Sequence, residues 1–160
     1  MKKAFFYLLV VSYFIVGCKS AEPVTNTKLD NKAEVALKGN WKITEVSFPG
    51  SNYFNITSFN IADSKCFVGS QWKFVSNNNK GEMNLTATGC QTYGSSITWY
   101  INKEGNMVMK FLSEGIKAKH TASGYILKVA NVTSNSFQLV DKMNVGGQIV
   151  DVVYQFNKNM

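Results

Sequence analysis

The stretch SITWYINKEGNMVMKFL, residues 96–112, contains two runs of alternating apolar and polar side chains. Ile97, Trp99 and Ile101 alternate with polar partners in the first run, and the second run repeats the pattern. Successive side chains of a strand point to opposite faces, so each run presents one apolar face. The break between them, NKEGN at 102–106, has the Asn and Gly content of a hairpin turn. The stretch therefore predicts two antiparallel strands that cover a core.

Eight runs of this kind lie between residue 41 and residue 156, and no long helical pattern competes with them. We expect strands at 41–48, 70–75, 82–87, 96–101, 107–112, 124–130, 136–140 and 148–156. The second, fourth and sixth links are short, at 76–81, 102–106 and 131–135, whereas the others include the long segments 49–69, 88–95 and 113–123, with the shorter 141–147. Alternate links of an antiparallel meander lie at opposite ends. The pattern predicts an all-β, eight-stranded up-and-down antiparallel barrel with one tight end and one end of large loops, and an open two-sheet sandwich is the alternative.

Gly39-Asn40-Trp41, at the head of the first run, resembles the Gly-x-Trp motif of the lipocalins. Residues 37–158 also resemble the lipocalin-like lipoprotein domains of Bacteroidetes, through LKGNW at 37–41, CFVGSQWKF at 66–74 and YQFNK at 154–158. The resemblance implies a barrel that binds a small apolar or amphipathic ligand. Two lipocalin features are missing: Thr133-Ser134-Asn135 replaces the usual turn motif, and the chain has no arginine to stack on the motif tryptophan.

The N-terminus has the pattern of a lipoprotein leader. Lys2 and Lys3 precede the apolar run 4–16, which is too short to span a bilayer, although an uncleaved anchor is the alternative. Ile15-Val16-Gly17-Cys18 resembles the bacterial lipobox, in which the cysteine is acylated. We expect a signal peptide at 1–17, lipid on Cys18, a flexible tether at 18–36 and the barrel at 37–160, with the protein lipid-anchored to the outer membrane of a bacterial envelope, on its periplasmic or surface side.

Charge argues against nucleic-acid binding. The net charge is +7, but all 17 basic residues are lysines and they are scattered along the chain. Without arginine there is no bidentate donor for phosphate or guanine. The partners that remain are the membrane through the N-terminal lipid, a small ligand, or a protein of the envelope.

The two cysteines that follow Cys18 are expected to form a disulfide. Cys66 lies near the end of the first long link and Cys90 just after the third run, so both belong to the loop-bearing end. An envelope compartment oxidises such pairs. A bridge would hold the first long loop across the mouth, and two buried free thiols are the alternative.

Catalytic signals are weak in this sequence. The single histidine, His120, lies in a lysine-flanked polar loop, and no nucleophile or metal-binding motif accompanies it. The acidic residues are scattered, and Asp141 and Asp151 are expected to face solvent beside strand ends. We expect a protein that is not an enzyme and uses no metal or cofactor.

Strand parity predicts which side chains point inward. With Trp72 and Phe74 inside, the residues expected to contact a ligand near the mouth are Trp72, Ile97, Phe111, Tyr125 and Val150. The closed end is expected to be plugged by Trp41, Phe74 and Phe156, with Met83, Ile101 and Met107. Aromatic residues of the loops, Tyr53, Phe54, Phe59 and Phe67, would form a lid or a partner-facing patch, or would fold back as a buried cap. Two functions follow: a ligand-binding barrel, or a packed barrel that docks a partner protein of the envelope.

Overall fold

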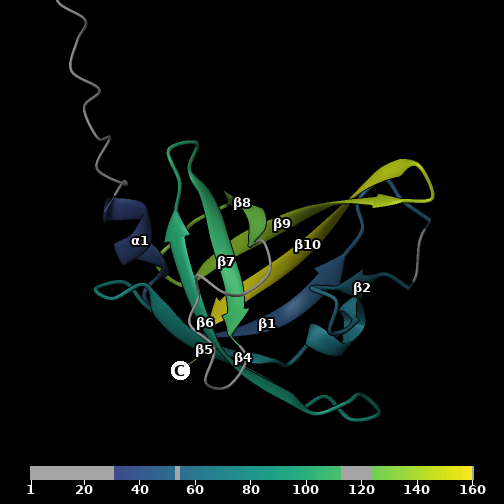
Figure 1. Ribbon diagram of the computed structural model, residues 1–160, viewed down its shortest axis with the longest axis horizontal. Helices are drawn as coiled ribbons and strands as arrows, with labels where there is room; N and C mark the ends of the chain where they lie inside the picture. Colours follow the sequence, from purple (N-terminus) through teal and green to yellow (C-terminus); the bar gives the residue numbers. More distant parts are fainter. Residues whose placement is uncertain (1–30, 53–54, 113–123, 160) are drawn as a thin grey trace, which may run out of the picture.

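The computed structural model describes residues 31–52, 55–112 and 124–159 of the chain (Figure 1). The signal peptide, Cys18, Tyr53, Phe54 and His120 lie outside the described residues. Within the described part, no helix is long and apolar enough to cross a membrane.

Eight antiparallel strands close into the predicted barrel. In their order around the wall they are β1 (Gly39–Ser47), β10 (Gln148–Lys158), β9 (Ser136–Val145), β8 (Tyr125–Ala130), β7 (Asn106–Leu112), β6 (Tyr93–Ile101), β5 (Lys80–Leu85) and β4 (Gln71–Val75), which pairs again with β1. Each neighbour along the chain from β4 to β10 is a neighbour in the wall, as in an up-and-down meander. The closed wall explains why apolar and polar residues alternate along the strands, and it excludes the alternative of an open two-sheet sandwich.

The inner face of the wall is apolar, as parity predicts. On β6 the side chains of Ile97, Trp99 and Ile101 are fully buried, and on β5 buried and exposed residues alternate strictly. Gly81 of β5 also faces inward, and a Cβ there would lie 2.3 Å from the carbonyl oxygen of Lys73 and 2.9 Å from Ile97. Only glycine lets the strands approach this closely.

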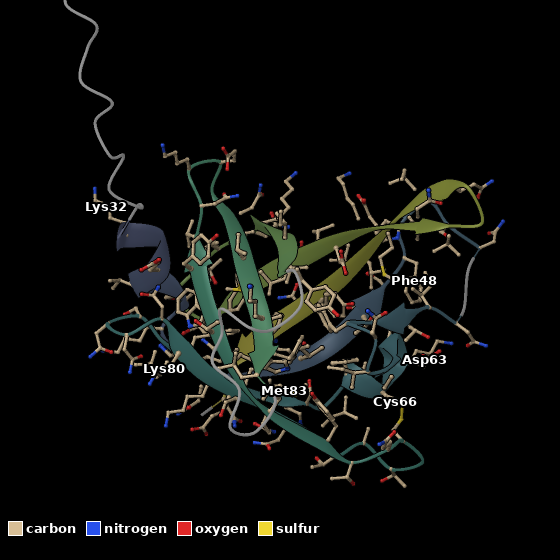
Figure 2. All side chains as sticks on the ribbon, viewed as in Figure 1. Lys32, Phe48, Asp63, Cys66, Lys80 and Met83 are labelled. Atoms are coloured by element: carbon tan, nitrogen blue, oxygen red, sulfur yellow. A yellow bond between two sulfur atoms is a disulfide. The ribbon has the colours of Figure 1, made fainter. Side chains whose placement is uncertain are left out.

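The two ends of the barrel differ. The links β4–β5, β6–β7 and β8–β9 lie at one end, called the turn end, and the long links lie at the other, called the loop end. Figure 2 shows the separation: Lys32 and Lys80 lie toward one side of the barrel, and Asp63 and Cys66 toward the other.

A short helix, α1 (Asn31–Leu37), packs on the turn end (Figure 1). Leu37 is fully buried, and the Glu34 carboxylate accepts hydrogen bonds from the backbone N–H of Ile101 at 3.2 Å and the side chain of Asn79 at 3.3 Å. The predicted tether at 18–36 was therefore wrong in its last six residues, which are structured. The polar composition of this segment indicated no helix, because its order comes from contacts with the barrel.

Strand β9 is longer than the sequence predicted. It pairs with β10 through Asp141↔Val152, Lys142↔Asp151 and on to Val145↔Gln148, so the link shrinks to Gly146-Gly147. Both glycines have positive φ, 58° and 87°, which two-residue hairpin turns favour. The polar residues between 141 and 147 looked like a loop but lie in a paired ribbon.

Candidate functional site

A segment of the first long link covers the loop end of the barrel, and we call residues 55–69 the cap. It contains the short strands β2 (Thr57–Ser58) and β3 (Ala62–Asp63) and the 3-10 helix η1 (Ser64–Phe67). A three-residue turn, Phe59-Asn60-Ile61, joins β2 to β3, and Phe59 and Asn60 both have φ of 54°. Left-handed backbone is strained for a bulky residue such as Phe59, by about 1–2 kcal/mol.

The Phe59 ring holds this turn in place by entering the barrel. Only 4% of Phe59 is exposed. Its ring centroid lies 5.1–6.4 Å from those of five other aromatic residues, which are Phe67, Trp72, Phe111, Tyr125 and Tyr154. Of the loop aromatics that the structure describes, Phe59 and Phe67 thus fold back as a buried cap and form no exposed patch.

Hydrogen bonds fix the cap to two wall strands. The Tyr154 hydroxyl of β10 donates to Ser58 Oγ, which lies 2.6 Å from Ser64 Oγ, and Ser64 in turn donates to the carbonyl of Ile56. From β8, the Tyr125 hydroxyl donates to the carbonyl of Phe59 at 2.7 Å. Both phenols are therefore committed to the cap.

The predicted disulfide is confirmed. Cys66 of η1 and Cys90 of the β5–β6 link are bonded with Sγ atoms 2.04 Å apart and Cα atoms 5.8 Å apart, and Figure 2 shows Cys66 in the cap near Asp63. The bridge attaches the cap covalently to the β5–β6 link, which lies next to it at the rim of the barrel.

The structure brings three of the five predicted mouth residues into one aromatic cluster around Phe59. Phe111 and Tyr125, which are partly exposed, have ring centroids 5.8 Å apart. Trp72 is 2% exposed and also contacts the plug below, with its ring centroid 5.6 Å from that of Phe156. Ile97 and Val150 are buried on the inner face but take no part in the ring cluster.

The predicted plug residues are packed at the turn end. Trp41, Phe74 and Phe156 are each 1% exposed, and the Trp41 indole donates to the Leu37 carbonyl at 2.8 Å. Phe137 also belongs to this group, although it was not among the expected plug residues. Its ring centroid lies 4.6 Å from that of Phe156, on which it stacks, and 4.7 Å from that of Trp41, which it meets edge-on. Phe137 lies two residues before Leu139 on the same strand, so the alternation of the strand would have predicted that both point inward. This end has no exposed aromatic surface among these four residues.

The expectation that Asp141 faces solvent was wrong, because its side chain lies on the inner face of the barrel wall. On β9 it shares the inner face with the buried Phe137 and Leu139, and its partner in register on β10 is the fully buried Val152. Burial raises the pKa of the Asp141 carboxyl above its usual range. Its carboxylate remains partly accessible to solvent, and no hydrogen bond to it is seen among the described residues. Asp151, by contrast, lies on the outer face, where it pairs with Lys142 at 3.1 Å as predicted for a solvent-facing group.

Burial also raises the pKa of the neighbouring phenols. For Tyr154 and for Tyr125 desolvation is the main cause, and the negative charge of Asp141 adds to it in both. The three groups therefore lie close enough to interact electrostatically inside the loop end.

A hollow of about 320 Å³ opens at the rim of the mouth. Its lining comes from the start of the first link and the start of β10, namely Gly50, Ser51, Asn52, Gln148, Ile149 and Val150. A second hollow, of about 340 Å³, includes Lys73, Glu82 and Ser96, which face outward on β4, β5 and β6. Among the described residues, no cluster of His, Cys, Asp and Glu has the arrangement of a metal site.

Comparisons with known proteins identify one matching family model and several similar solved structures. Residues 37–140 match a family model described as a lipocalin-like domain. A bovine odorant-binding protein in complex with a selenium-containing odorant is similar at 10% identity, with 79% of this chain and 73% of that chain covered and a TM-score of 0.45. The odorant-binding protein from bovine nasal mucosa is similar at 11% identity, with 78% and 72% covered and a TM-score of 0.44. No curated protein matches the chain.

Proposed function

The chain belongs to the family of lipocalin-like domains, and from this premise we propose that it binds a small hydrophobic or amphipathic molecule at the loop end of its barrel. The proposal is for a binding protein and not for an enzyme. Its site is the space that the Phe59 ring fills, bordered by Trp72, Phe111, Tyr125 and Tyr154.

The observation that carries the proposal is that the Phe59 ring comes from a turn of the cap and not from a strand of the barrel wall. The bordering rings stand on wall strands, where the ladder of hydrogen bonds fixes them, whereas Phe59 stands on the three-residue turn of the cap. Withdrawing Phe59 loses about 1.5–3 kcal/mol of side-chain burial but relieves part of the turn's backbone strain. An apolar ligand that replaces the ring restores the buried contacts, so the exchange is close to balanced.

We further propose that Cys18 is acylated and holds the protein at a bacterial envelope membrane. The support is the leader pattern, in which two lysines, a short apolar run and Ile15-Val16-Gly17 precede the cysteine. More than one acyl chain on Cys18 would make anchoring stable.

The binding proposal is tested by opening the mouth and titrating an apolar fluorescent probe. Phe59→Gly removes the ring and suits the left-handed backbone of the turn. We expect the variant to bind N-phenyl-1-naphthylamine about tenfold more tightly than the unmodified protein, because displacement of the ring no longer opposes binding. Adding Phe111→Ala to the variant should weaken binding again.

Phe137→Ala is the matched control, since it removes an equally buried ring from the turn end. It should lower the melting temperature without increasing probe binding, and thermal melts of all variants exclude simple unfolding. If neither the unmodified protein nor Phe59→Gly binds the probe, the proposal is wrong. The packed interior would then favour the alternative role, docking of an envelope partner.

A further inference from the structure

The inner face of β9 changes character from the turn end toward the mouth. Phe137 and Leu139 are buried apolar residues, and the next side chain on the same face is Asp141. Beyond it lie the partly buried Met143 and Val145. A carboxylate thus interrupts an otherwise apolar row.

No counter-charge is supplied by the neighbouring residues. Lys142, next in sequence, points to the outer face and pairs with Asp151 at 3.1 Å. The hydroxyls of Tyr154 and Tyr125 donate to the cap. Partial burial disfavours the charged form of the Asp141 carboxylate, and no ion pair or hydrogen bond seen among the described residues compensates it.

Aromatic rings border the same space. The Tyr125 and Tyr154 rings flank Phe59 with centroid distances of 5.1 and 5.3 Å. The negative charge of Asp141 contributes to the raised pKa of both phenols. A molecule that replaces the Phe59 ring would therefore lie between two aromatic rings, of which Tyr154 is the stacked one, with a carboxylate nearby. Carboxylates and aromatic faces both attract ammonium groups, the first by charge-assisted hydrogen bonds and the second by cation–π interaction.

We infer that the molecule bound in the mouth combines an apolar body with a protonated amine, and that Asp141 receives the amine between the rings of Tyr125 and Tyr154. This inference rests on the proposed ligand binding and names the chemical class of that ligand. The raised carboxyl pKa agrees with it, because burial disfavours the Asp141 charge in the empty protein and an ammonium partner would restore it.

Three probes that share a ten-carbon chain test the inference. Decylamine, decanol and decanoate are titrated below their aggregation limits against the purified protein at neutral pH, with displacement of N-phenyl-1-naphthylamine as the readout. We expect decylamine to bind about tenfold or more tightly than decanol, and decanoate to bind most weakly.

Two isosteric variants separate the carboxylate of the mouth from ordinary surface charge. Asp141→Asn should abolish the preference for decylamine over decanol. Asp151→Asn, which neutralises the outward carboxylate on the adjacent strand, should keep the preference intact. Thermal melts confirm that each variant is folded.

The outcomes distinguish the two proposals. If decanol displaces the probe but decylamine gains nothing, or if Asp141→Asn keeps the amine preference, the amine inference is wrong and ligand binding stands. If neither the three compounds nor the apolar probe binds the protein or Phe59→Gly, the proposed function fails and the inference fails with it.

Discussion

Two neighbouring positions on one strand face show how much a single residue decides in this barrel. Leu139 and Asp141 both point inward from β9, but the first is buried in the core and the second places a partly exposed carboxylate nearer the mouth. Alternation alone predicts the direction of both side chains. The assignment of 141–147 to a loop hid the second, because Asp, Lys and Asn are common in turns and their pairing with β10 depends on contacts distant in sequence.

The pH dependence of stability follows from the raised pKa of Asp141. A carboxyl whose pKa is higher in the folded than in the unfolded chain binds its proton more tightly when folded. Its favourable contribution is therefore present in acid and is lost as pH rises through the folded pKa. We expect Asp141→Asn to melt at a higher temperature than the unmodified protein at pH 7, with the difference closing as pH falls toward the ordinary carboxyl value of 3.8.

Melting curves between pH 4 and pH 8 measure this difference. Tyr125 and Tyr154, the titratable groups that act on Asp141 from β8 and β10, stay neutral over this range because burial raises their pKa values. Asp151→Asn controls for charge removal on the outer face. A difference that is independent of pH, or a variant less stable than the unmodified protein at pH 7, contradicts the prediction.

At the scale of elements, α1 and the cap were beyond the reach of sequence patterns. A seven-residue helix is too short to be stable alone, so α1 forms because Leu37 and Glu34 find partners on the barrel. The cap likewise depends on where the Phe59 ring can be buried. The eight strands, by contrast, carry their signal locally, in the period-two alternation of runs such as Ile97, Trp99 and Ile101.

The dependence of α1 on Glu34 gives a stability prediction. Glu34→Ala leaves the backbone N–H of Ile101 without its acceptor at a buried site, so we expect the free energy of unfolding to fall by about 1–3 kcal/mol. Urea denaturation measures the loss. Val35→Ala is the control on the same helix, since Val35 is 62% exposed and its truncation should change little. Equal effects of the two substitutions would mean that Glu34 does not hold the helix.

The disulfide gives a second prediction for the cap. Its two cysteines are 24 residues apart, and closing a loop of that size stabilises a fold by roughly 3 kcal/mol in the loop-entropy model. The double variant Cys66→Ser/Cys90→Ser should unfold at correspondingly lower urea concentration. Binding of N-phenyl-1-naphthylamine should also increase, because the cap opens more readily. A double variant with unchanged stability would show that the hydrogen bonds of Tyr125 and Tyr154 suffice to hold the cap.

For the whole molecule, the barrel and its two unlike ends could be predicted from link lengths, and Trp41, Phe74 and Phe156, which the sequence placed at the closed end, are buried in the structure. What the mouth contains could not be predicted in the same way. Whether Phe59 fills the barrel or covers its outside depends on packing among residues from several strands, and no local pattern encodes that choice.

The proposed attachment of the protein to a membrane through Cys18 gives a prediction for the whole molecule. Cys18→Ala removes the proposed acylation site, so the variant should take up no label when cells grow with a palmitate analogue, and it should leave the membrane fraction or remain as uncleaved precursor. Cys66→Ser/Cys90→Ser serves as the control, because it removes cysteines but keeps Cys18. Equal labelling of Cys18→Ala and the unmodified chain would refute the lipoprotein proposal.

The position of α1 determines which end of the barrel the N-terminal segment joins. The described chain begins at Asn31 on the turn end, opposite the cap (Figure 1). The thirteen residues from Cys18 to Asn31 reach at most about 45 Å even when fully extended. If Cys18 is acylated as proposed, the link to the bilayer would join the barrel at its turn end, and the mouth would lie at the end away from the point of attachment. Such a protein would collect molecules already released into solution, and would keep near the membrane surface what would otherwise diffuse away.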